Sequence, residues 1–170
     1  SHPRNLQAWR SAQAGTMSRF LSGLYSVAIV MWVGAMWTVG YMVAPVLFAT
    51  LSDRGLAGIL AGKLFGLVAM LGIAVAVFLI ASLLFRRGLQ VFRDRVFWVV
   101  LAMLVMTLVG HFGIQPVMAQ LKADALPREV MQSVLRDRFA TWHGISSVLY
   151  LIQSVLGLAL ILLHGRGPRP

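Results

Sequence analysis

The sequence predicts an all-α protein that crosses a membrane four times, and three observations lead to this prediction. Hydrophobic residues make up 59% of the chain and charged residues only 12%, whereas soluble domains carry about 25% charged residues. The apolar residues are gathered in four continuous blocks, each long enough for the roughly 20 helical residues that cross a bilayer. The cationic residues lie mainly in the short segments between these blocks. We therefore expect a four-helix transmembrane bundle.

The first segment, residues 1–16, is polar and basic and has no apolar core. It is therefore predicted to be neither a signal peptide nor a span. Met17 then opens a stretch that is typical of a natural start. We expect residues 1–16 to be a flexible tail or an upstream extension, residues 17–164 to form a single membrane domain, and residues 165–170 to be a basic tail.

The first two spans are expected at about residues 20–48 and 63–85. Because the first exceeds the minimum length, it is expected to tilt or to bend near Pro45. Three glycines recur at four-residue intervals where the second span begins, namely Gly58, Gly62 and Gly66. Small residues at this spacing give a flat helix face on which another helix packs closely. The face indicates packing within the bundle, for example against the first span, with homodimerisation as the alternative.

The last two spans are expected at about residues 96–118 and 143–163. The third follows the most basic connection, Arg86 to Arg95. Between the third and the fourth, the segment from Pro127 to Phe139 has apolar residues at helical spacing with charges between them. This pattern predicts a short interfacial helix before the last span.

The distribution of lysine and arginine predicts the orientation. Nine of these residues fall on the side that holds both termini and the Arg86 to Arg95 connection, and six fall on the other side. The positive-inside rule therefore places both termini in the cytoplasm of a bacterial-type inner membrane. The same placement accounts for the net charge of +10, so we expect the lipid bilayer, and no nucleic acid, as the partner of these cations.

Polar residues recur at helical spacing in two of the spans. In the third span they are Thr107, His111 and Gln115, and in the fourth they are His143, Ser147, Tyr150 and Ser154. Each set occupies one helix face. Because polar groups in hydrocarbon need partners, the two faces are expected to turn toward each other or toward a shared cavity.

A compact bundle would bring several of these residues together in its non-cytoplasmic half. The members of this cluster are Lys63, His111, Gln115, Arg138 and His143, and Ser147 and Tyr150 extend it along the fourth span. Such a cluster suits an anion, a metal ion or a porphyrin, and two histidines can bind haem b or a transition metal. No acidic residue lies inside a span to complete a metal site. The structural alternative is that the histidines are hydrogen-bonded packing residues and the cations extend to the interface.

Three segments, WVGAMWTVGYMVAPVLF, GLAGILAGKLFG and FATWHGISSVLYLIQSV, resemble the transmembrane protein 205-like family of small four-span proteins. The resemblance covers essentially Met17 to His164. It implies four spans and a broad link to drug and metal resistance, with no assigned activity. The positions that match are Trp32, Gly34, Pro45, Phe48, Gly62, Lys63, His143 and Ser147.

The first of these segments is also similar to the first span of haem-binding protoporphyrinogen oxidases and of CopD-type copper-resistance proteins. This more distant resemblance implies a haem held by a histidine ahead of the tryptophan. The corresponding stretch here, GLYSVAIVMW, has no histidine. A haem would therefore need His111, His143 or Lys63 as its ligand.

No Walker loop, dinucleotide-binding glycine pattern or nucleophile elbow is present, and without cysteine the chain has no thiol chemistry. We therefore do not expect an enzyme. The expected function is an inner-membrane protein that binds a small ligand or ion in the polar cluster, with a role in stress or in metal or drug tolerance. The alternatives are a b-type haem or metal-binding redox protein, and an accessory or assembly subunit of a larger membrane complex.

Overall fold

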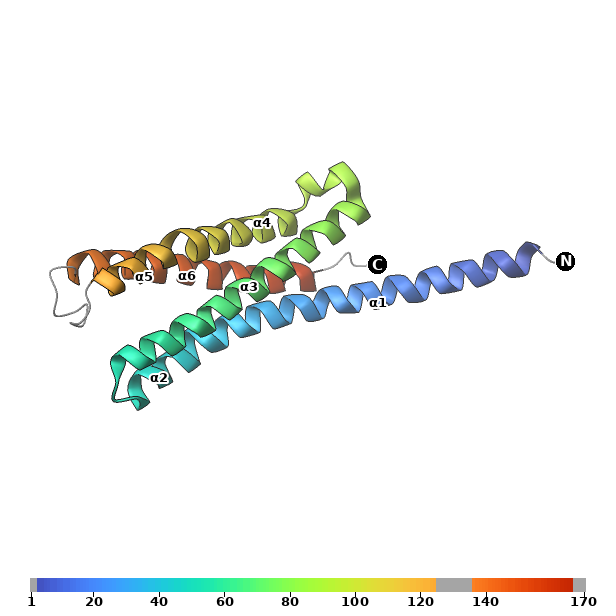
Figure 1. Ribbon diagram of the computed structural model, residues 1–170. Helices are drawn as coiled ribbons and strands as arrows, with labels where there is room; N and C mark the ends of the chain where they lie inside the picture. Colours follow the sequence, from blue (N-terminus) through green and yellow to red (C-terminus); the bar gives the residue numbers. More distant parts are fainter. Residues whose placement is uncertain (1–2, 125–135, 167–170) are drawn as a thin grey trace.

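The computed structural model describes residues 3–124 and 136–166. Within these ranges, four helices are long and apolar enough to cross a membrane, so the predicted helical bundle is confirmed. The first membrane helix consists of α1 (Pro3–Thr38), the π-helical η1 (Val39–Val43) and α2 (Ala44–Thr50), and the second consists of α3 (Arg54–Arg87) and the 3-10 helix η2 (Gly88–Arg93). The third consists of α4 (Arg95–Leu108), the π-helical η3 (Val109–Ile114) and α5 (Gln115–Asp124), and the fourth is α6 (Arg136–Gly165) (Figure 1).

The helices form a closed ring of neighbours. Both α1 and α4 pack against α3 and α6, and successive helices run in opposite directions (Figure 1). One end of the bundle carries η2 and the last turns of α3 and α6; because Arg86, Arg87, Arg93 and Arg95 lie there, we call it the arginine end. The other end carries α2, α5 and the start of α6, and we call it the α2/α5 end.

Local signals in the sequence set the ends of these helices. The carboxylate of Asp53 accepts a hydrogen bond of 3.1 Å from Leu56 N at the start of α3. Asp94 does the same for Val96 N at 2.9 Å at the start of α4. Such caps satisfy backbone N–H groups that have no partner within the helix. Gly88 ends α3 with a φ of 56°, a conformation that glycine adopts without steric cost.

The apolar core occupies the middle of the bundle and its arginine end. It includes Tyr25, Ile29, Trp32, Val33, Met36, Val68, Val75, Ala76, Leu79, Leu83, Phe97, Val100, Met103 and Leu160. Trp32 is only 1% exposed and lies on Gly72, where an added Cβ would be 2.6 Å from the indole nitrogen. A glycine at this position lets α1 and α3 approach closely.

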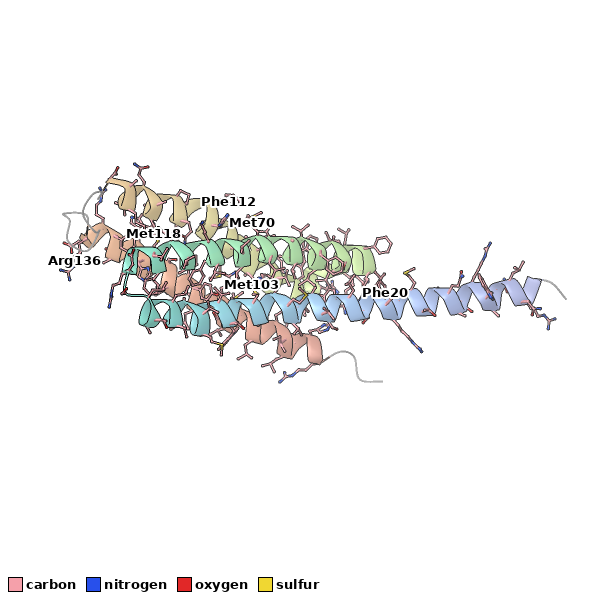
Figure 2. The ribbon with its side chains drawn as sticks, turned by 60° about the horizontal axis from the view of Figure 1, so that its bottom comes forward. Phe20, Met70, Met103, Phe112, Met118 and Arg136 are labelled. Atoms are coloured by element: carbon pink, nitrogen blue, oxygen red, sulfur yellow. The ribbon has the colours of Figure 1, made fainter. Side chains whose placement is uncertain are left out.

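Large apolar side chains also cover the outer surface of the bundle. Figure 2 shows Met70 and Phe112 directed away from the helices, whereas Met103 lies between them; Met70 and Phe112 are both exposed. Outward apolar side chains of this size suit a hydrocarbon solvent. The chain is therefore a multi-pass membrane protein whose environment is a lipid bilayer.

Two of the membrane helices contain a π-helical segment directly before a proline. The segment η1 is followed by α2, whose second residue is Pro45, and η3 is followed by α5, whose second residue is Pro116. Proline has no N–H, and its ring clashes with the carbonyl four residues earlier. A wider turn at that point relieves the clash. The sequence predicted a tilt or bend near Pro45, and the structure places an irregular turn there and a second one in the third helix.

Three predicted segments either differ from the structure or lie partly outside the residues that it describes. Residues 3–16, expected as a flexible tail, continue α1, and α1 is exposed up to Leu24 as it extends out of the bundle (Figure 1). This stretch is rich in alanine, glutamine and arginine, which favour helix. The predicted interfacial helix falls mainly on residues 125–135, which lie outside the described ranges, while residues 136–139 form the first turn of α6. Of the predicted tail at residues 165–170, the last four also lie outside those ranges.

Candidate functional site

An open groove of about 410 Å³ lies between α3 and the η3–α5 segment, at the α2/α5 end. It forms because α5 packs mainly against α6, so the third membrane helix diverges from α3 beyond η3. Four polar side chains line the groove: Lys63 from α3, His111 from η3, and Gln115 and Lys122 from α5. The structure thus brings together three residues that the sequence analysis selected, Lys63, His111 and Gln115.

The glycines at the start of α3 form one wall of this groove. An added Cβ at Gly66 would be 3.8 Å from His111 Cε1, and one at Gly58 would be 3.9 Å from Lys122 Nζ. At Gly62 an added Cβ would meet no atom within 4 Å. The sequence analysis gave the first span as an example of the packing partner, but the structure directs Gly58 and Gly66 toward the third. Bare backbone here leaves room for the His111 and Lys122 side chains and for a ligand beside them.

The groove is electropositive. Among residues 3–124 and 136–166, the structure shows an ion pair between Arg87 and Asp94, at the arginine end. No described carboxylate forms an ion pair with Lys63 or Lys122. The Lys122 ammonium lies 5.6 Å from the centroid of the Phe139 ring, within the range of a cation–π interaction. Phe139 in turn stacks on His143, with ring centroids 5.9 Å apart. His143 is therefore next to the rim of the groove, behind Phe139, and does not line it.

The other residues selected on the fourth span lie outside the groove. Arg138, His143 and Ser147 are exposed on α6, and the Ser147 hydroxyl donates to the backbone oxygen of His143 at 2.8 Å. Arg138 and His143 are thus not brought together with Lys63 and His111 in one cavity.

The η3 segment explains why the polar faces of the third and fourth helices do not meet along their whole length. Thr107, before η3, is buried; its hydroxyl donates to Met103 O at 2.8 Å and accepts from the Gln153 amide of α6. His111, within η3, lies instead beside Gly66 of α3. A π turn inserted in an α-helix shifts the register of the residues in and after it, so the α-helical spacing rule does not hold from Thr107 across η3.

Tyr150 belongs to a separate, partly buried polar network that joins α6 to α1 and η1. Its hydroxyl donates to the backbone oxygen of Met36, and its ring lies on Gly40, where an added Cβ would be 2.8 Å from Tyr150 Cζ. The Tyr41 hydroxyl donates to Ser154 Oγ at 2.9 Å, and the Trp37 indole N–H donates to Ser154 O at 3.2 Å. Because these groups satisfy one another, the network acts as a structural joint between the two helices.

The sequence analysis missed three residues at these sites. Lys122 lies beyond residue 118, where the third span was expected to end, although its position seven residues after Gln115 places both on one helix face. Gln153 is a polar residue inside an apolar block, and this alone is a signal. Gly40 had a weaker signal, a glycine shortly before Pro45.

The donor set of the groove suits an anion better than a metal cation. Two ammonium groups repel cations, and the Gln115 amide and the His111 ring can donate hydrogen bonds to an anion. In the part of the chain that the structure describes, no group of three or more His, Cys, Asp or Glu residues could hold a metal ion.

The comparisons with known proteins place this groove inside a recognised domain. Residues 27–127 match the family described as a domain of unknown function, DUF4149. The match extends from α1 beyond α5 and therefore includes the four polar residues of the groove. No curated protein and no solved structure matches the chain.

Proposed function

The chain belongs to the DUF4149 family, and we propose that it is a bacterial inner-membrane protein that binds a small anionic ligand in the groove between α3 and α5. The observation that supports this most directly is the lining of the groove, in which Lys63, His111, Gln115 and Lys122 surround bare glycine backbone. All four residues lie in the segment that defines the family.

The physical argument rests on charge and access. Lys63 and Lys122 come from different helices, so an anion between them gains attraction from both sides. That attraction is stronger in a partly apolar groove than in water. The exposed backbone at Gly62 allows a ligand to approach α3 closely, and Gln115 and His111 can orient it through hydrogen bonds.

The charge distribution supports an orientation for this site. The arginine end carries Arg86, Arg87, Arg93 and Arg95, and we assign it, with both termini, to the cytoplasm. The groove then opens at the opposite, periplasmic side. The resemblance to transmembrane protein 205-like proteins supports a role in stress or in metal or drug tolerance. In that role, the anion bound in the groove would be the ligand of the protein.

The haem-binding alternative draws less support from the geometry. A bis-histidine haem would need His111 and His143 on one cavity, but His143 stacks behind Phe139 and His111 lies beside Gly66. The Lys63 ammonium would have to lose its proton to ligate iron.

Binding is tested by thermal unfolding of the full chain in detergent, followed by tryptophan fluorescence, with phosphate, sulfate and succinate as probes. At a concentration 100 times the Kd, a ligand stabilises the folded state by about 2.7 kcal/mol. We expect at least one probe to raise the Tm in a saturable way. Lys63→Gln and Lys122→Gln should abolish this rise. The control Arg138→Gln removes an exposed cation at the same end that does not line the groove, and should leave the rise unchanged. No stabilisation by any probe, or equal stabilisation in all four proteins, would refute the proposal.

The orientation in the membrane is tested in a separate experiment by cysteine labelling. The chain has no cysteine of its own, so each introduced thiol is the one that reacts. Single variants Ser52→Cys and Leu89→Cys place one thiol at each end of the bundle. In intact spheroplasts, a membrane-impermeant maleimide should label Ser52→Cys, whereas Leu89→Cys should react only after lysis. The reverse pattern would overturn the assignment of the two ends.

A further inference from the structure

A second polar cluster lies at the arginine end, where α1, α3 and α6 meet. The ring of Tyr25 from α1 lies 5.2 Å from the ring of His164 from α6, centroid to centroid. The guanidinium carbon of Arg86, near the end of α3, lies 5.6 Å from the centre of the Tyr25 ring. The next residue of α1, Ser26, forms a 2.7 Å hydrogen bond with His164 Nε2. This cluster is at the opposite end of the bundle from the groove and is independent of it.

The Tyr25 hydroxyl is the feature of this cluster that points to a ligand. Tyr25 is only 4% exposed. Its hydroxyl is buried and has no hydrogen-bond partner within residues 3–124 and 136–166. Leaving such a group unpaired costs about 1–3 kcal/mol, and native proteins pair nearly all of them. A phenol is a hydrogen-bond donor, so the missing partner is an acceptor.

Arg86 supplies a positive charge at the same place. Its neighbour Arg87 forms an ion pair with Asp94, at 3.3 Å, and Asp94 also accepts from Val96 N at the start of α4. The Asp94 carboxylate is therefore engaged with Arg87 and with the helix cap. Arg86 is exposed and lies over the Tyr25 ring, so rotation of its flexible side chain would open a path to the hydroxyl.

Ser26 and His164 hold the cluster in place. The Ser26 hydroxyl lies 3.1 Å from Ser22 O and 2.7 Å from His164 Nε2, and the tautomer of His164 decides which partner of the second bond donates. This bond joins the last turn of α6 to α1 and keeps the His164 ring against Tyr25. Ser26 and His164 are therefore positioning residues for the phenol.

We propose that Tyr25 and Arg86 bind the phosphate group of an anionic phospholipid, with the phenol and the guanidinium donating hydrogen bonds to phosphate oxygens. Arg86 is one residue from the end of α3, the depth at which headgroups meet a membrane helix. A guanidinium matches phosphate in both charge and geometry, and basic pockets between membrane helices bind anionic headgroups. The lipid phosphate supplies the acceptor that the Tyr25 hydroxyl lacks.

The test measures lipid binding to the delipidated full chain in detergent, by native mass spectrometry and by the shift in Tm. The lipids are phosphatidylglycerol and phosphatidylcholine, with inorganic phosphate as a third probe. Tyr25→Phe removes only the hydroxyl and keeps the ring, and Arg86→Gln removes the charge. Arg93→Gln is the matched control, because Arg93 is an exposed arginine at the same end that does not touch Tyr25.

We expect phosphatidylglycerol to bind more tightly than phosphatidylcholine and to raise the Tm of the original chain and of Arg93→Gln. Tyr25→Phe and Arg86→Gln should each weaken phosphatidylglycerol binding by about tenfold, the scale of one charge-assisted hydrogen bond. Without lipid, Tyr25→Phe should be at least as stable as the original chain, because it removes an unpaired buried group. Equal phosphatidylglycerol binding by all variants would overturn the proposal. So would an equal effect of inorganic phosphate alone, which would assign the cluster to a free anion. Lys63→Gln should leave this lipid effect unchanged, so the two sites fail or succeed separately.

Discussion

Substitution of Gly40 by alanine would disturb the joint between α1 and α6. An alanine Cβ at this position would lie 2.8 Å from Tyr150 Cζ and 2.9 Å from its hydroxyl oxygen, so the ring must move. Overpacking of this kind costs about 1–3 kcal/mol. Movement of the ring also breaks the hydrogen bond from Tyr150 to Met36 O, worth about 0.5–1.5 kcal/mol.

The same substitution brings a smaller opposing gain. Replacing glycine by alanine inside a helix stabilises by about 0.5–1 kcal/mol where the site is unstrained. The net expectation for Gly40→Ala is therefore a loss of about 1–3 kcal/mol. At about 2–4 °C per kcal/mol for a chain of this size, the Tm should fall by roughly 2–12 °C.

The assay is thermal unfolding in detergent, followed by tryptophan fluorescence and by far-UV circular dichroism. Gly34→Ala is the matched control, because Gly34 lies on the same helix and an added Cβ there would meet no atom within 4 Å. This control should be neutral or slightly stabilising. A Gly40→Ala protein that is as stable as Gly34→Ala would show that the Tyr150 ring does not rest on Gly40, and the reasoning would fail.

Three further predictions concern the core and the helix caps. Gly72→Ala should lower the Tm and shift the fluorescence of the buried indole, because the new Cβ would lie 2.6 Å from Trp32 Nε1; an unchanged emission spectrum and Tm would contradict this. Gln153→Ala should destabilise the protein by about 2–5 kcal/mol in thermal unfolding, the usual range for deletion of a large buried side chain. This loss should exceed that of Thr107→Ser, because serine keeps the hydroxyl that Gln153 contacts. Asp94→Ala should cost about 0.5–2 kcal/mol through the lost cap on α4, with little added by its ion pair, because the Arg87 partner is exposed; faster amide hydrogen exchange confined to the first turn of α4 would confirm the cause.

A local sequence pattern predicted some residues of the candidate site but not the contacts that those residues make. Lys63, His111 and Gln115 could be selected because polar groups in an apolar span need a reason to be there. Their partners could not be identified in the same way. Spacing of four predicted that Thr107 and His111 share a face, but the π turn before Pro116 separates them, so Thr107 meets Gln153 and His111 lies beside Gly66.

The sequence alone determined that this is a helical membrane protein with four long apolar helices, because a continuously apolar segment of about 20 residues satisfies its own backbone polar groups in hydrocarbon only as a helix. Only the tertiary structure decided which polar residues meet. Divergence of α5 from α3 opens the groove that Lys63 and Lys122 share, and the convergence of α1, α3 and α6 buries the hydroxyl of Tyr25. Helix composition is a local property of the chain, whereas the rotation and separation of packed helices depend on glycines and prolines acting on residues far away in the sequence.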